Sequence, residues 1–107
     1  MAKKEEYIKL ENEIVQQLKT CFDPEIPVNI YELGLIYGIN LSDDFIVTIT
    51  MTLTAPNCPV AESLPLEVRD KVKQVYGVKD AVVNIVFDPP WSKDMMSETA
   101  LMELGFL

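Results

Sequence analysis

The chain has 107 residues, of which 49% are hydrophobic, and a formal net charge of −8. This length fits a single small domain over residues 1–107, and the composition is typical of a globular protein, not a disordered one. The acidic balance argues against nucleic acid and anionic membranes as partners. No apolar run approaches the ~20 residues that span a bilayer. The basic start has no apolar segment behind it, so we expect a cytoplasmic protein without a secretory signal.

The first predicted element is an amphipathic helix from Glu5 to Cys21, where apolar side chains recur at helical spacing. The two prolines of Asp23–Pro27 end this helix because neither can continue it. Asn29 then predicts the cap of a single turn, which Gly34 closes.

The next two elements predict a β-hairpin. Ile36–Leu41 has the character of a strand, Ser42–Asp44 forms a turn cluster, and Phe45–Thr54 alternates apolar residues with threonines. Such alternation is typical of a strand with one buried face, so the second strand should carry its hydroxyl groups on the opposite face.

A second helical pattern runs from Val60 to Val75 and contains Pro65. Two starting points are open. In the first, which we favour, the helix begins at Pro59 and bends at Pro65; in the second, a short turn precedes a helix that begins near Ser63.

The last predicted elements are a strand and a helical segment. Gly77 ends the second helix, and Ala81–Phe87 predicts a strand apolar enough to be central in the sheet. Ser92–Leu104 predicts a helical segment with a second cap at Ser97, which Gly105 stops. A right-handed crossover makes the third strand parallel to the second. The expected fold is α+β, a two-layer sandwich in the order α-β-β-α-β-α on a three-stranded mixed sheet.

The absence of histidine limits the chemistry of the chain. With no histidine and two cysteines, one chain cannot form a histidine-based triad, a histidine metal site or a four-thiolate cluster site. Cys21 lies on the apolar stripe of the first helix and is predicted to be a core residue. Cys58 lies between Pro56 and Pro59, where capping geometry at a helix start favours the thiolate. A bound metal would need carboxylates, a second subunit or a partner protein.

Three segments together resemble a known family. They are Asp23-Pro24-Glu25-Ile26-Pro27 with Tyr31–Tyr37 after it, then Thr52–Pro59, then Phe87–Ser92. The chain is similar to the SufT-like and PaaD-like metal–sulfur cluster assembly proteins, whose eukaryotic members serve the cytosolic iron–sulfur targeting complex. It lacks the cysteine-rich C-terminal extension of PaaD-type members and the P-loop of ATPase-fused relatives, which favours the short SufT-like subgroup.

The resemblance implies an accessory, non-enzymatic maturation factor that helps deliver iron–sulfur clusters to apoproteins. It places the motif cysteine at Cys58 and the acidic motif at Asp23 and Glu25, as candidate ligands of a transient iron ion or iron–sulfur cluster. Thr54 and Asn57 are supporting candidates: Thr54 could hydrogen-bond the sulfur or merely complete the threonine face, and Asn57 also fits a loop former. The implied partners are the iron–sulfur assembly machinery and recipient apoproteins, and a homodimer could bring two Cys58 thiols together.

Other interpretations stay open. A metal-free adaptor would scaffold assembly proteins through the surface formed by Trp91, the last helix and Tyr31–Tyr37, although Trp91 also fits a lid over one end of the sheet. A maturation factor for a metal-dependent oxygenase is a further alternative. A thiol enzyme is disfavoured because the chain has no Cys-x-x-Cys pair. The methionines Met95, Met96 and Met102 predict adaptable packing.

Overall fold

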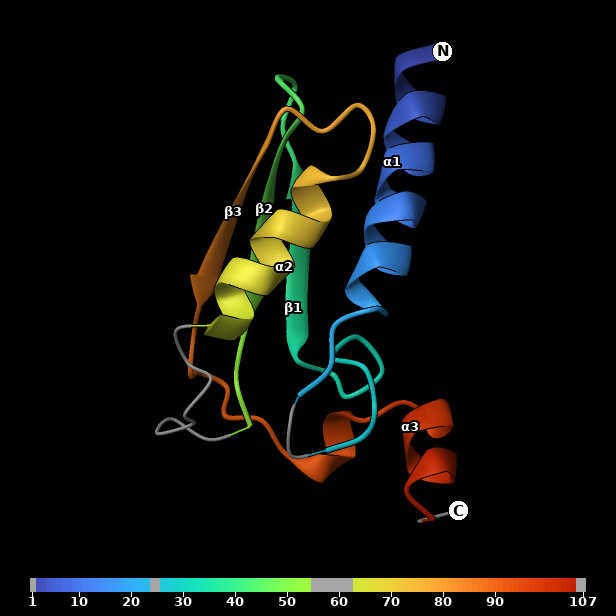
Figure 1. The fold of residues 1–107 in the computed structure, drawn as a ribbon, viewed down its shortest axis with the longest axis vertical. Helices are drawn as coiled ribbons and strands as arrows, with labels where there is room; N and C mark the ends of the chain where they lie inside the picture. Colours follow the sequence, from blue (N-terminus) through green and yellow to red (C-terminus); the bar gives the residue numbers. More distant parts are fainter. Residues whose placement is uncertain (1, 24–25, 55–62, 106–107) are drawn as a thin grey trace.

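The fold comes from a computed structural model, which describes residues 2–23, 26–54 and 63–105. Helices and strands follow one another in the predicted order α-β-β-α-β-α, with a short 3-10 turn before the last helix (Figure 1). Two helices lie on one face of a three-stranded mixed sheet, and the last helix lies beyond one end of the strands. The predicted α+β class and two-layer arrangement are therefore confirmed.

The first helix, α1, spans Ala2–Leu18 and packs its apolar stripe against α2 and the sheet. Leu10 and Ile14 lie on this stripe and are buried. The helix ends earlier than predicted because the backbone N–H of Thr20 turns back to the Gln17 carbonyl, which also accepts the Thr20 hydroxyl at 2.6 Å. None of the helices in the described ranges is long and apolar enough to cross a membrane.

The sheet confirms the predicted hairpin and corrects the place of the third strand. β1 (Ile36–Leu41) pairs antiparallel with β2 (Ile46–Met51), and β3 (Asp80–Ile85) pairs parallel with the other side of β2. The prediction that the third strand is central is wrong, because β2 is central and β3 is an edge. The apolar run of β3 includes Val82 on the sheet face away from the helices, where its side chain is 44% exposed.

The alternating pattern of β2 matches its two environments. Val47, Ile49 and Met51 are fully buried under the helices, whereas Thr48 and Thr50 on the other face are only half-buried. Fully burying an aliphatic side chain of this size contributes about 1.5–3 kcal/mol. The predicted division into an apolar face and a hydroxyl-bearing face is confirmed.

The second helix, α2, spans Ser63–Lys73 and is buried along the face that runs from Leu64 to Val72. Pro65 lies in its first turn, where the backbone N–H has no intrahelical acceptor and a proline is tolerated. The favoured start at Pro59 lies outside the described residues. The helix as described therefore contains Pro65 without a break.

The C-terminal segment is divided where a single helical stretch was expected. The 3-10 turn η1 (Lys93–Met95) and the helix α3 (Glu98–Glu103) are separated by Met96, whose backbone is extended at φ −68 and ψ 144. Ser97 caps α3 as predicted, with its side chain accepting a backbone N–H at 3.1 Å. Its own N–H donates to the carbonyl of Glu32 at 2.9 Å, which fixes the break.

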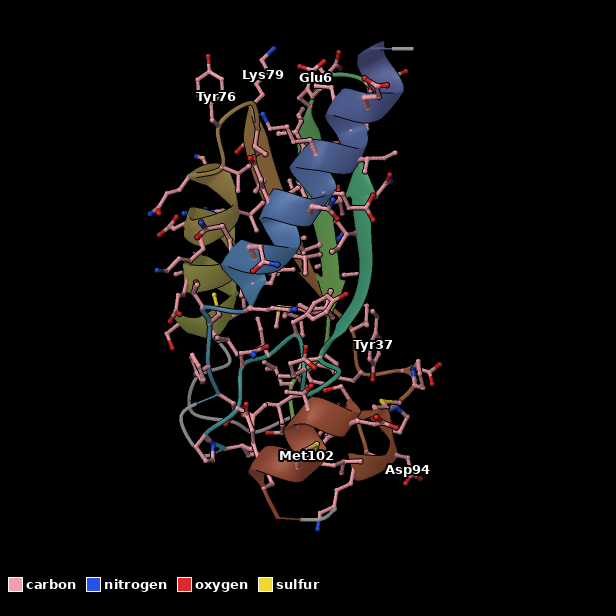
Figure 2. The ribbon with its side chains drawn as sticks, turned by 90° about the vertical axis from the view of Figure 1, so that its right-hand side faces the viewer. Glu6, Tyr37, Tyr76, Lys79, Asp94 and Met102 are labelled. Carbon is pink, nitrogen blue, oxygen red and sulfur yellow. The ribbon has the colours of Figure 1, made fainter. Side chains whose placement is uncertain are left out.

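The methionines of this segment differ in their surroundings. Met96 is buried in the core, whereas Met102 is 66% exposed on α3 (Figure 2). The predicted packing role is therefore wrong for Met102. Ala100 is buried and Leu101 packs against the core, and Met102 lies on the solvent side of this six-residue helix.

Candidate functional site

The structure brings Asp23 and Thr54 together from segments far apart in the sequence. Asp23 follows α1 and Thr54 follows β2, and the Thr54 hydroxyl donates to Asp23 Oδ2 at 3.4 Å. Asp23 is only 2% exposed. Burying a carboxylate is costly unless its oxygens are paired, so this side chain is held in place by the surrounding fold. The pair marks the part of the predicted site that the described residues contain.

Local backbone pairing explains why Asp23 points inward. Phe22 forms an isolated antiparallel bridge with Asn29, and the N–H of Ile30 donates to the Cys21 carbonyl at 2.9 Å. Extended backbone alternates its side chains between two sides. Phe22 is accordingly 51% exposed, while the next residue, Asp23, is buried. The segment after α1 thus acts as a short strand that directs the carboxylate into the protein.

The predicted turn after this segment holds it against the end of β2. Asn29 caps the turn, with its side-chain oxygen accepting the N–H of Glu32 at 2.9 Å. Gly34 ends it with φ +83, a backbone conformation that favours glycine. The carbonyl of Leu35 then accepts the N–H of Thr52 at 2.9 Å. This last bond ties the turn to the chain that leads from β2 to Thr54.

Cys21 is a core residue, as the helical stripe predicted. It is fully buried, and burial, together with the nearby Glu67 carboxylate, raises the pKa of its thiol to about 11. The thiol is therefore neutral at physiological pH, and a neutral thiol is neither a good nucleophile nor a metal ligand. Of the two cysteines, only Cys58 remains a candidate for thiol chemistry.

Thr52 is a feature that the sequence pattern did not separate from the other threonines. Its side chain is 1% exposed, and its hydroxyl has no hydrogen-bond partner among the described residues. An unpaired buried hydroxyl is unusual and costs free energy. Alternation along the strand could not reveal this, because Thr48 and Thr50 share the pattern but are half-buried.

The other predicted site residues are not described. Cys58, Asn57 and Glu25 lie outside the described residues, so their distances from Asp23 stay predictions. Within the described ranges, no group of three or more histidine, cysteine or acidic side chains could hold a metal ion. The described part of the chain thus offers the buried Asp23 carboxylate as its contribution to the predicted ligand set.

Trp91 and Tyr37, the predicted partner surface, both make contacts inside the protein. The Trp91 indole N–H donates to the Leu33 carbonyl at 2.7 Å, and the half-buried ring packs against the core. The Tyr37 hydroxyl donates to the Pro89 carbonyl at 2.8 Å, and Figure 2 shows this side chain directed toward the C-terminal segment. These contacts fit the lid interpretation of Trp91.

Comparison with known proteins identifies the class of protein. A family model described as "Iron-sulfur cluster assembly protein" matches residues 11–85. The chain belongs to this iron–sulfur cluster assembly protein family. The matched range contains Asp23, Thr54 and all three strands, so the family assignment rests on the part of the fold that holds the candidate site.

Individual relatives agree with this assignment. The chain is 55% identical over 102 residues to the Fe-S protein maturation auxiliary factor of Porphyromonas gingivalis, covering 95% of this chain and 97% of that protein. It is 41% identical over 83 residues to the Fe-S protein maturation auxiliary factor SufT of Staphylococcus aureus, covering 78% and 94%. The crystal structure of a domain of unknown function, DUF59, from Bacillus anthracis superimposes with a TM-score of 0.85 at 36% identity, covering 92% and 94%. The predicted SufT-like resemblance is confirmed.

Proposed function

We propose that this chain is an iron–sulfur protein maturation factor that handles a cluster as its cargo. Its family and the names of its relatives in Porphyromonas gingivalis and Staphylococcus aureus support this role. The structural observation that best supports the proposal is the buried Asp23 carboxylate, which accepts a hydrogen bond from the Thr54 hydroxyl. Thr54 directly precedes the segment that contains Cys58. We place the protein in the cytoplasm, where its thiols stay reduced.

In this proposal, Cys58 binds an iron atom of the cluster as a thiolate and releases its proton on binding. The carboxylates of Asp23 and Glu25 supply oxygen ligands or stabilise the bound iron. This set is incomplete compared with the four thiolates of a resident iron–sulfur site. A recipient apoprotein with a full set of cysteines therefore binds the cluster more tightly, and exchange of one thiolate for another completes the transfer.

The same ligand set makes an accessory protein a better fit than an enzyme. A carboxylate beside a thiol opposes its ionisation unless a cation lies between them. Asp23 would thus hinder a cysteine nucleophile but would favour a cysteine that shares a metal with it. The maturation role then accounts for both Cys58 and Asp23, whereas a cysteine-based reductase accounts for Cys58 alone.

A metal-free adaptor is the main competing function. It would need an exposed recognition surface formed by the last helix and Tyr31–Tyr37, with Trp91 and Tyr37 as part of it. The Trp91 indole N–H and the Tyr37 hydroxyl both donate to carbonyls of this chain, at 2.7 Å and 2.8 Å respectively. These two bonds hold the turn between β3 and η1 in place. This internal role weakens the adaptor proposal but leaves the cysteine-centred one untouched.

Reconstitution of the purified chain with iron and sulfide under anaerobic conditions separates the two functions. We expect the wild-type chain to develop the visible absorption of an iron–sulfur cluster, and a metal-free adaptor would stay colourless. Cys58→Ser should lose this absorption. Asp23→Asn, which keeps the size of the side chain and an oxygen that can accept from Thr54, should hold the cluster more weakly.

Cys21→Ala is the matched control because it removes the other cysteine without touching the proposed ligands. It should develop the same absorption as the wild type. If Cys58→Ser binds the cluster as well as the wild-type chain, the proposed ligand is wrong. If Cys21→Ala loses the cluster while it remains folded, the assignment of the two cysteines is reversed.

A further inference from the structure

Asp23 and Thr52 are the two buried polar residues of the described chain, and only one of them has its partner in the described structure. Thr52 is 1% exposed and Asp23 is 2% exposed. The Asp23 carboxylate accepts a hydrogen bond from the Thr54 hydroxyl, whereas the Thr52 hydroxyl has no partner among the described residues. A buried hydroxyl without a partner lowers the stability of the fold that contains it. The stability of the unloaded chain therefore does not explain why a hydroxyl stands at this position.

Backbone pairing places Thr52 at the point where the sheet ends. The Met51 carbonyl accepts the N–H of Val86 at 2.9 Å. The N–H of Thr52 donates to the Leu35 carbonyl, also at 2.9 Å. Beyond these two bonds, the backbone of residues 53–54 makes no hydrogen bond within the described part of the chain. Thr52 is thus the last fixed point of the strand, and the residues after it can shift relative to it.

The Thr52 side chain belongs to the same side of the chain as Thr54. Side chains two positions apart in extended backbone point to the same side, and the Thr54 hydroxyl contacts Asp23 Oδ2 at 3.4 Å. This contact is longer than the usual O–H···O bond of about 2.7–2.8 Å, so it is weak. A cation that binds Asp23 competes with Thr54 for the carboxylate oxygen. Loss of the Thr54 bond would release the chain directly after Thr52.

We propose that the Thr52 hydroxyl is a binding group for the cargo, and that it donates a hydrogen bond to a sulfide of the bound iron–sulfur cluster. This inference rests on the proposed function and adds one residue to its site. The iron atoms of a cluster are cations, which suit the Asp23 carboxylate. The sulfides are anionic acceptors, and a threonine hydroxyl can donate one hydrogen bond. Hydrogen bonds to charged acceptors are stronger than neutral ones, and bonds to the sulfurs tune a cluster.

The Thr52 hydroxyl then acts in opposite directions in the two states of the chain. In the unloaded chain it is buried without a partner and lowers stability. In the loaded chain it gains an acceptor and stabilises the complex. Valine has nearly the same shape as threonine but no hydroxyl, so it should favour the unloaded fold and disfavour the cluster. A hydroxyl with a purely structural role would change both properties in the same direction.

Thr52→Val tests this opposition with two measurements on the full chain. Without iron, we expect thermal unfolding to show a Tm about 4 °C above that of the wild type, because an unpaired buried hydroxyl is removed. After anaerobic reconstitution with iron and sulfide, the visible absorption of the cluster is followed in excess EDTA. We expect Thr52→Val to lose this absorption about tenfold faster than the wild type, the effect of one lost hydrogen bond to a charged group.

Thr52→Ser and Thr50→Val are the matched controls. Thr52→Ser keeps the hydroxyl but loses a buried methyl group, so its Tm should fall below that of the wild type. Its cluster should nevertheless outlast that of Thr52→Val. Thr50→Val removes a half-buried hydroxyl from the same face of β2 and should leave the rate of cluster loss unchanged.

The outcomes separate this inference from the proposed function. A Tm of Thr52→Val below that of the wild type shows that the hydroxyl is paired in the unloaded chain and overturns the inference. A Thr52→Val cluster that is lost no faster than the wild-type cluster also overturns it, as does a Thr52→Ser cluster that is lost as fast as that of Thr52→Val. All three results leave the proposed function in place when the wild type binds a cluster. A wild-type chain that forms no cluster overturns the proposed function and this inference with it.

Discussion

Asp23 and Cys21 follow α1 two positions apart, and both side chains are buried. Their chemistry differs because their partners differ. Asp23 is met by the Thr54 hydroxyl at the end of β2, which suits a charged oxygen. Cys21 lies in the hydrophobic core, and burial raises its pKa to about 11. At the scale of single residues, the fold thus buries the Cys21 thiol in its neutral form and holds the Asp23 carboxylate as part of the candidate site.

The sequence predicted the core environment of Cys21 but not the burial of Asp23. The helical stripe through Ile14 and Leu18 continues to Cys21, so its burial follows from periodicity. The burial of Asp23 depends on the bridge between Phe22 and Asn29, which pairs the chain across two prolines. A turn of the same sequence without that bridge would leave the carboxylate in solvent.

The raised pKa of Cys21 predicts how stability changes at high pH. The thiol binds its proton more tightly in the folded chain than at the ordinary pKa of 9.0. Its contribution to the free energy of unfolding is therefore complete below pH ~9 and is lost as the pH rises through about 11, at about 1.4 kcal/mol per pH unit between the two values.

Urea unfolding of the wild type and Cys21→Ala at pH ~8 and pH ~10.5 measures this effect. Other groups titrate in the same range in both proteins, so the difference between their pH slopes isolates Cys21. We expect the wild type to lose more stability than Cys21→Ala. Equal slopes would show that the thiol is not protected by burial.

At the scale of elements, one glycine turn joins the N-terminal half of the chain to the C-terminal segment. A side chain added at Gly34, which has φ +83, would place its Cβ 2.2 Å from the Met95 carbonyl oxygen. The turn can therefore pack against η1 only with glycine at this position. Trp91 strengthens the same junction through its bond to the Leu33 carbonyl.

Gly34→Ala should therefore destabilise the chain by about 3 kcal/mol or more, because backbone strain and overpacking add. Gly105→Ala is the matched control, since Gly105 has φ +82 but no atom of the described residues lies within 4 Å of an added Cβ. Its cost should stay near ~1 kcal/mol. Thermal unfolding of both variants gives the comparison, and similar losses would contradict the close contact with Met95.

The elements themselves were largely predictable because their patterns are local. The strict alternation from Val47 to Leu53 identified β2, and the cap at Ser97 identified the start of α3. The central place given to the third strand was wrong because an apolar run does not reveal how many layers cover a sheet. In this two-layer fold, Val82 is left on the uncovered face.

At the scale of the whole molecule, the two ends of the sheet have different roles. The candidate site lies where β2 ends, near the turn from Asn29 to Gly34 and the C-terminal segment. The α2–β3 turn with Tyr76 lies at the opposite end (Figure 2). The candidate site and this turn are therefore separated by the length of the strands.

The central claim is that this chain matures iron–sulfur proteins through Cys58. The most direct measurement is the activity of an endogenous iron–sulfur enzyme in cells that lack the chain, complemented with wild type, Cys58→Ser or Cys21→Ala at matched protein levels. We expect wild type and Cys21→Ala to restore the enzyme and Cys58→Ser to fail. Full restoration by Cys58→Ser would contradict the account.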